Sequence, residues 1–249
     1  MKKRYQAIAT LLALCLVGLQ AARAGSPAND APTATSARVM GVVKFEGIVP
    51  KAIHINMAAD PNCARQHPNG AAAEDIVADS NGGLENVFVF ISDGLGDRAF
   101  DPPQKPAVIE QKGCMYEPHV VAMQAHQKLD VVNADSTTHN IHPLPNNNRE
   151  WNKSQPPGLP IEETFPREEV AIPVKCNVHP WMRSYIAVFK HPYFAVTGKD
   201  GSFDLKDLPP GTYTLEAWHE KLGTAIQKVT IGPSETKTVQ FVFKGRPGA

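Results

Sequence analysis

The sequence predicts an all-β protein, and its turn residues and the length of its apolar segments support this fold class. The 249 residues include 22 Pro and 18 Gly, which favour short strands and many turns over long helices. Most apolar segments are four to seven residues long and are bounded by residues typical of turns. A chain of this length can bury one large core or two small ones.

The N-terminus has the features of a secretory signal peptide. Lys2, Lys3 and Arg4 precede an apolar run over residues 7–19, and small residues flank an expected cleavage after Ala24. We therefore expect residues 1–24 to be a signal peptide and the protein to be periplasmic or secreted. No later stretch approaches the roughly 20 apolar residues that a membrane-spanning helix needs.

The remaining chain is mildly acidic. Residues 1–24 carry four basic and no acidic side chains, so 21 basic residues remain against 25 acidic ones, a net charge of −4. Nothing in this balance suggests a nucleic-acid partner.

Short strands are expected along most of the chain after a flexible leader. Residues 25–36 lack large apolar side chains and have nothing to bury. Residues 143–160 contain many Pro and Asn, so we expect a long loop there. The predicted strands cover residues 39–45, 52–57, 86–92, 107–110, 120–123, 128–133, 170–175, 185–189, 193–197, 203–205 and 213–218.

A compact sulfur and imidazole motif indicates half of a metal site. Cys176, His179 and Met182 follow one another at steps of three residues after a predicted strand. Soft sulfur ligands beside imidazole suit copper, and a trigonal His2Cys set with a weak axial Met makes an electron-transfer copper centre. Such a set needs one more His from another strand.

His139 and His142 are the candidates for that ligand. They lie three residues apart, so on an extended strand they point to opposite faces and only one can easily bind the metal. We choose His139, because the next residue, Asn140, could fasten the two loops by hydrogen bonding.

These residues carry a family resemblance. The Cys-x-x-His-Pro-aromatic-Met run and the upstream His-Asn-x-His resemble the cupredoxins, the plastocyanin-like blue copper proteins, and most closely those of the amicyanin type. The resemblance implies a Greek-key β-sandwich over residues 101–189. It also implies one type 1 copper bound by His139, Cys176, His179 and Met182.

The same resemblance implies where redox partners would bind. The partly exposed edge of His179 would be the electron port, and redox proteins would dock there transiently. Pro180 and Trp181 would contribute to an apolar docking patch, although Trp181 could simply shield the site from water.

A second resemblance concerns the C-terminal segment. Thr197–Phe203 reads Thr-x-x-Asp-Gly-x-Phe and Leu208–Tyr213 reads Leu-Pro-Pro-Gly-x-Tyr, which are similar to the carboxypeptidase regulatory-like, transthyretin-like sandwich. Its opening strands would come from the N-terminal part of the chain. Residues 37–100 and 190–245 would then form a second, smaller β-sandwich with the cupredoxin inserted between them. Two tandem domains are the alternative.

The cysteine count is compatible with a free thiol at the metal site. Without the signal peptide the chain keeps three cysteines, an odd number in a compartment that permits disulfides. A Cys63–Cys114 disulfide would leave Cys176 unpaired for a metal. The competing interpretation is a second metal site formed by Cys63, His67, Cys114 and His119.

The leading functional prediction is a periplasmic, non-enzymatic copper protein that transfers electrons. The rival is an extracytoplasmic β-sandwich binding or scaffold module that keeps copper for stability or trafficking. A copper oxidase or nitrite reductase would need a further catalytic copper with its own His cluster, which we do not see in the sequence. His191 and His219 lack ligand-spaced partners, and we expect them to be structural.

Overall fold

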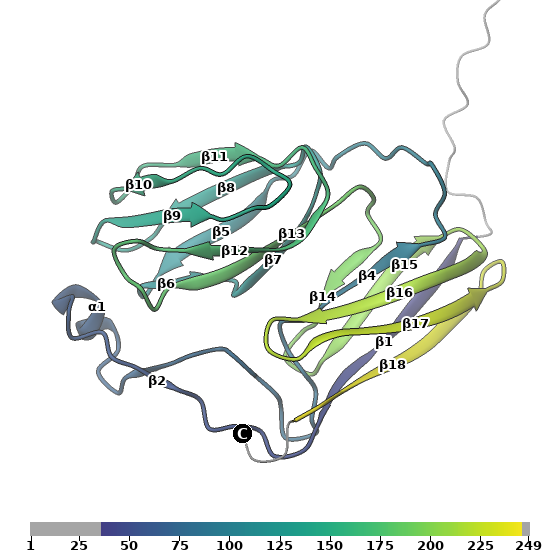
Figure 1. Ribbon diagram of the computed structural model, residues 1–249, viewed down its shortest axis with the longest axis horizontal. Helices are drawn as coiled ribbons and strands as arrows, with labels where there is room; N and C mark the ends of the chain where they lie inside the picture. The colour runs from purple at the N-terminus through teal and green to yellow at the C-terminus, as the bar shows by residue number, and fades with distance from the viewer. Residues whose placement is uncertain (1–35, 246–249) are drawn as a thin grey trace, which may run out of the picture. The chain divides into compact units, whose positions relative to one another are not determined.

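A computed structural model describes residues 36–245, which form strands and one short helix (Figure 1). The expected signal peptide, residues 1–24, and residues 25–35 of the expected leader lie outside the described residues. The predicted all-β class is confirmed. Within residues 36–245, no helix has the length and apolar character needed to cross a bilayer.

Two sheets enclose one hydrophobic core, and we call this unit the terminal sandwich. A three-stranded sheet has the order β15-β1-β18, and a four-stranded sheet has the order β14-β4-β16-β17. The strands are β1 (Ala37–Glu46), β4 (Phe88–Asp93), β14 (Phe194–Val196), β15 (Ser202–Leu208), β16 (Gly211–His219), β17 (Gly223–Ile231) and β18 (Thr236–Lys244). β1 and β4 thus pair with strands that follow residue 190. The assignment of this sandwich to the carboxypeptidase regulatory-like family stays a prediction.

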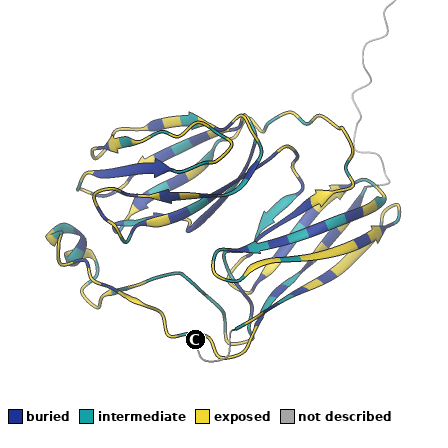
Figure 2. Cartoon of the chain, in the orientation of Figure 1, coloured by how far each residue is buried: buried dark blue, intermediate teal, exposed yellow. Residues whose placement is uncertain are grey.

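The burial patterns of β1 and β4 explain their sequences. Buried positions alternate with exposed or half-buried ones along β1, as expected for a strand with one face in a core (Figure 2). β4 is apolar at consecutive positions because both of its faces are covered. Val89 and Ile91 belong to the core of the terminal sandwich, whereas Phe88 and Phe90 pack in a separate cluster with Phe189.

Two further sheets form the central sandwich, which carries the metal-site motif. The orders are β10-β9-β12-β13-β7 and β11-β8-β5-β6. The strands are β5 (Ala107–Lys112), β6 (Met115–Glu117), β7 (Val120–Gln124), β8 (Lys128–Asn133), β9 (His139–Pro143), β10 (Lys153–Gln155), β11 (Ile161–Thr164), β12 (Glu169–Lys175) and β13 (Arg183–Phe189). Their inward side chains form one buried cluster that includes Cys176 and Met182.

The expected loop over residues 143–160 is wrong in one part. Lys153–Gln155 form β10, in which Ser154 pairs with Asn140 of β9. These three residues are free of Pro and Gly, so the backbone can pair even though the flanking segments cannot. β9 itself begins at His139, so the candidate ligand opens a strand.

The segment between β1 and β4 also differs from expectation. The expected strand over residues 52–57 shrinks to β2 (His54–Ile55), which pairs with β3 (Ala71–Ala72), and the helix α1 (Pro61–Gln66) lies between them. The α1 helix begins there because Asp60 caps it, its side chain accepting from the Asn62 amide, and because Pro61 suits the first turn.

We call residues 54–72 the cover. They were expected in the terminal sandwich, but Ile55, Met57 and Cys63 instead belong to the core of the central sandwich. A disulfide between Cys63 and Cys114 attaches α1 to the turn between β5 and β6. The cover therefore packs on the central sandwich although it precedes β4 in the sequence.

Candidate metal centre

Two strands and one loop deliver the predicted ligands. His139 is the first residue of β9, and Cys176 follows the last residue of β12. The loop from Cys176 then turns back on itself, because the Met182 amide donates to the His179 carbonyl at 3.0 Å and the Cys176 amide donates to the Met182 carbonyl at 3.3 Å. This tight turn aims Cys176 and His179 toward His139.

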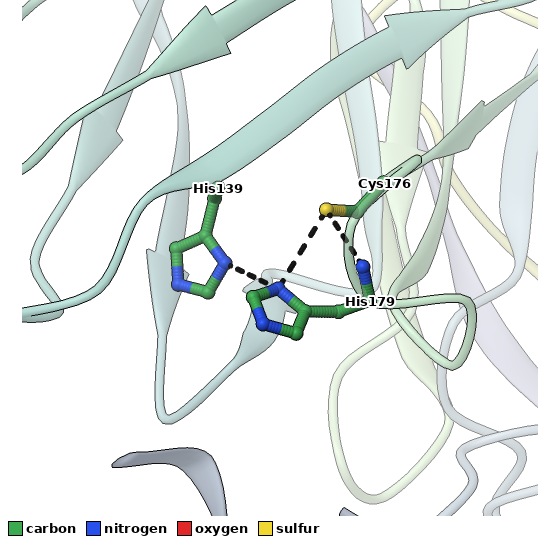
Figure 3. A group of neighbouring side chains, drawn as sticks. All are labelled: His139, Cys176 and His179. Carbon is green, nitrogen blue, oxygen red and sulfur yellow. Dashed lines mark hydrogen bonds between the residues drawn. The ribbon is translucent and has the colours of Figure 1, made fainter. Parts of the chain in front are cut away.

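The three side chains converge in the interior (Figure 3). The Nδ1 atoms of His139 and His179 are 2.9 Å apart, and Cys176 Sγ lies 3.8 Å from His179 Nδ1. One ligand atom from each residue lies within 4.8 Å of the others, and all three residues are buried. Met182 is fully buried in the same core, where its main chain closes the loop.

The second nitrogen of each imidazole faces a carboxylate. His139 Nε2 lies 2.8 Å from Asp135 Oδ2, and His179 Nε2 lies 3.1 Å from Asp60 Oδ2. A carboxylate accepts hydrogen bonds, so the nitrogen facing it carries the proton and the other nitrogen can offer a lone pair. In that tautomer both Nδ1 atoms can act as metal ligands.

The donor set fits a soft transition-metal ion. Bonds of about 2.0 Å to nitrogen and about 2.3 Å to sulfur, as metal sites use, can be accommodated between donor atoms at these separations. At 2.9 Å the two Nδ1 atoms can share a proton in the metal-free protein, and a metal ion would displace that proton. Thiolate beside imidazole is the combination that copper sites use.

Electrostatics favour the thiolate that a metal needs. Burial alone would raise the pKa of the Cys176 thiol, but hydrogen bonds from His139 and from the backbone of His179 and Val178 outweigh it and lower the pKa. Burial likewise opposes the charge on His139, yet Asp135 and Cys176 raise its pKa to about 8. Binding a metal here would replace that imidazole proton.

Asn140 joins the ligand loop to two strands. Its Oδ1 accepts from the Asn177 amide at 3.0 Å, and its Nδ2 donates to the Lys153 carbonyl at 3.1 Å. Tyr116, which the sequence did not single out, also links two strands. Its hydroxyl lies 2.6 Å from the Asn140 carbonyl of β9 and 3.1 Å from the Lys175 carbonyl of β12.

The expected exposure of His179 is wrong. Only 2% of the residue is exposed, because Asp60 and Cys63 of the cover lie against its Nε2 edge. Cys63 Sγ is 3.6 Å from that nitrogen. The sequence could not place the cover there, since Asp60 precedes His179 by 119 residues.

The alternative of a second metal site at Cys63, His67, Cys114 and His119 is not supported. Cys63 and Cys114 are bonded to each other, and Cys176 is free and buried. His67 Nε2 lies 2.6 Å from the Gly113 carbonyl, and His119 contacts Glu220 instead.

Among residues 36–245, His142, His191 and His219 belong to none of the side-chain groups close enough to hold a metal. His142 contacts Glu150 through Nε2 and Asn177 through Nδ1. His191 donates from Nε2 to the Ile91 carbonyl at 2.9 Å, and His219 Nδ1 accepts from the Lys221 amide at 3.1 Å. Each of these imidazoles thus has a hydrogen-bonding partner of its own.

The proposed docking residues differ in exposure. Pro180 is exposed, whereas Trp181 is half-buried and donates from Nε1 to the Cys114 carbonyl at 3.0 Å. The Trp181 ring lies 5.1 Å from the His179 ring, centroid to centroid. Trp181 therefore shields the imidazole, while Pro180 and the neighbouring Val178 face solvent.

Comparison with known proteins gives matches only at the level of solved structures. No protein-family model matches the chain, and no curated protein matches it. An amicyanin variant in its Cu(I) form is 17% identical, with 40% of this chain and 97% of that one covered and a TM-score of 0.30. A purple cupredoxin from Nitrosopumilus maritimus is 23% identical, with 33% and 98% covered and a TM-score of 0.29.

A copper-containing nitrite reductase from Thermus scotoductus SA-01 also matches. It is 18% identical with a TM-score of 0.33, and the match covers 39% of this chain but only 25% of the reductase. Scores this low carry no conclusion about function, which we infer below from the residues of this chain. The matched structures are mostly cupredoxins, over about 40% of the chain, and they leave the family of the terminal sandwich unidentified.

Proposed function

We propose that this protein binds one copper ion in a type 1 site and transfers electrons to or from redox proteins outside the cytoplasm. His139, Cys176, His179 and Met182 would hold the copper. When bound, copper supplies a one-electron couple. The residues of the chain hold the ion, exclude water and orient the two imidazoles.

The observation that carries this proposal is the convergence of two carboxylate-oriented imidazoles on one buried thiol. Their Nδ1 atoms lie 2.9 Å apart beside Cys176 Sγ. Burial and tight turns keep the ligands in place, so little rearrangement accompanies a change of oxidation state. Such a site suits electron transfer.

One copper and no catalytic metal are proposed. Within residues 36–245, each group of His, Cys, Asp and Glu close enough to hold a metal includes His139 or His179. A separate catalytic copper would need its own ligands and an open position.

The test is the visible spectrum of the copper-loaded protein through a cycle of ferricyanide and then ascorbate. We expect an intense thiolate-to-copper band that bleaches on reduction and returns on oxidation. Cys176→Ala should lose the band completely, whereas His142→Ala, a change at the neighbouring histidine that lies outside the site, should keep it. A coloured Cys176→Ala variant would refute the assignment.

A second candidate is a binding or scaffold module whose copper serves stability or trafficking. The burial of the His179 edge by the cover favours it, because a closed edge hinders electron exchange with a partner. Electron self-exchange of the copper-loaded protein separates the two functions. Slow self-exchange together with tight copper retention would favour the second candidate.

A further inference from the structure

We infer that Asp60 is a positioning residue for the metal site, acting through His179, so that the cover is a functional part of the copper centre. This inference rests on the proposed copper site and extends it to a residue outside the central sandwich.

Three groups fix the Asp60 side chain. Its Oδ1 accepts from the Asn62 amide at 2.7 Å, which is the cap of α1. Its Oδ2 accepts from Thr137 Oγ1 at 3.2 Å and lies 3.1 Å from His179 Nε2. The carboxylate is therefore held in one orientation, with one oxygen on the helix and the other on the imidazole.

The two ligand imidazoles are supported in different ways. His139 has a local support, since Asp135 lies four residues before it and contacts its Nε2. His179 receives its carboxylate from the cover, across 119 residues of sequence. Without the cover, His179 would keep the backbone turn that aims its Nδ1 but would lose the partner of its Nε2.

The Cys63–Cys114 disulfide connects the segment that carries Asp60 to the turn that binds Asp135. Cys63 follows Asp60 in the first turn of α1, and its bonded partner Cys114 donates its amide to Asp135 Oδ2 at 2.8 Å. Asp135 also accepts from the Gly113 amide at 2.8 Å. Asp60, the disulfide and Asp135 thus form a continuous outer layer on the Nε2 side of the two imidazoles.

This layer has a predictable effect on bound copper. A carboxylate that accepts from the outer N–H of a ligating imidazole fixes the ring and makes the ligand a stronger donor. A stronger donor and a nearby negative charge favour Cu(II) over Cu(I). Asp60 should therefore tighten copper binding and lower the reduction potential.

The test is Asp60→Ser in the full chain. Serine keeps the helix cap but is too short to reach His179, so α1 should remain while the imidazole contact is lost. We expect copper affinity to fall about 10- to 100-fold, as for other outer-sphere partners of metal ligands. A tenfold loss in the preference for Cu(II) would raise the potential by about 59 mV.

A measurement without copper tests the contact itself. Nitrogen-15 chemical shifts of the metal-free protein report the tautomer of His179. The exchange rate of its Nε2 proton with water reports how well the Asp60 contact protects that proton. In the wild type we expect an Nε2-protonated ring with slow proton exchange, and in Asp60→Ser faster exchange. Asp60→Asn provides a second variant of similar size, should the serine variant fold poorly.

The matched control is Glu162→Gln, which removes one negative charge from an exposed strand position paired with Lys128. It should leave affinity and potential unchanged. Wild-type affinity, potential and proton exchange in Asp60→Ser would overturn the inference while leaving the copper site standing. A wild-type protein without a thiolate-copper band would instead refute the proposed function, and the His179 tautomer and exchange would still test Asp60.

Discussion

Removing the Cys63–Cys114 disulfide should free the cover and destabilise the copper-free protein by several kcal/mol. The bond joins residues 51 positions apart. Closing a loop of that length in the unfolded chain corresponds to about 4 kcal/mol at 25 °C in the chain-entropy treatment. The cover should open first, because α1 has six residues and Cys63 is the residue it buries, and isolated helices this short are unstable.

Urea unfolding of copper-free Cys63→Ala/Cys114→Ala, followed by tryptophan fluorescence, measures the loss. Trp181 reports on this region because its indole donates to the Cys114 carbonyl. Amide hydrogen exchange at Ala64, His67 and Gly70, whose amides bond within the cover, should report its opening separately.

Cys176→Ala is the matched control, since it removes a buried cysteine without breaking a covalent link. Loop closure predicts that the free energy of unfolding of the double variant lies well below that of this control. A difference of less than about 1 kcal/mol, with the cover amides still protected from exchange, would refute the reasoning.

Two further predictions concern pH. Burial alone would raise the pKa of Glu169, but hydrogen bonds from Asn146, Asn147 and Asn148 outweigh it and hold the pKa below its usual range. Its stabilisation is thus present at neutral pH and lost as the pH falls through the lowered pKa. Glu169→Gln should cost about 2 kcal/mol at pH 7 and less at pH 3 by urea unfolding, and an equal cost at both would contradict this. Burial lowers the pKa of His219 from 6.5 to about 4, so the unfolded chain binds the extra proton and about 3 kcal/mol of stability is lost as pH falls between those values. His219→Asn, which keeps an acceptor for the Lys221 amide, should show a smaller loss over this range, and a pH profile identical to the wild type would exclude the assignment.

The metal-site motif could be predicted because its geometry is local. Cys176 and His179 are three positions apart in a tight turn, so residue types and spacing carry most of the information. Strand alternation indicated that only one of His139 and His142 could be a ligand, and the neighbouring Asn140 favoured His139. The structure brings His139 to the other two side chains.

The outer layer could not be predicted because its parts are distant in sequence. Asp60 followed by Pro61 is typical of a helix start, which could have indicated α1 but not its place in the fold. The cysteine count provided the single link, since a Cys63–Cys114 bond requires residues near 63 to approach β6. Asp135, four residues before His139, was the nearer signal and was missed.

The strand predictions failed where pairing depends on a distant partner. β10 has three polar residues and forms because Asn140 and its neighbours in β9 present a free edge. The strand expected over residues 86–92 is confirmed as β4, but its sequence could not tell which face of the strand meets which core. The structure places Val89 and Ile91 in the core of the terminal sandwich, and Phe88 and Phe90 in the cluster with Phe189.

The pairing of β4 with β14 has a consequence for the modular exchange of domains. The chain leaves the terminal sandwich through β4 and returns through its direct neighbour β14, with Phe90 opposite Phe194. Replacing everything between them by a short turn would leave that sandwich with all its strands. Asp60 and Cys63, however, precede β4 and would remain with the host. Recombination at this boundary would therefore keep the four predicted copper ligands together but separate them from Asp60 and from Cys63, the disulfide partner of Cys114.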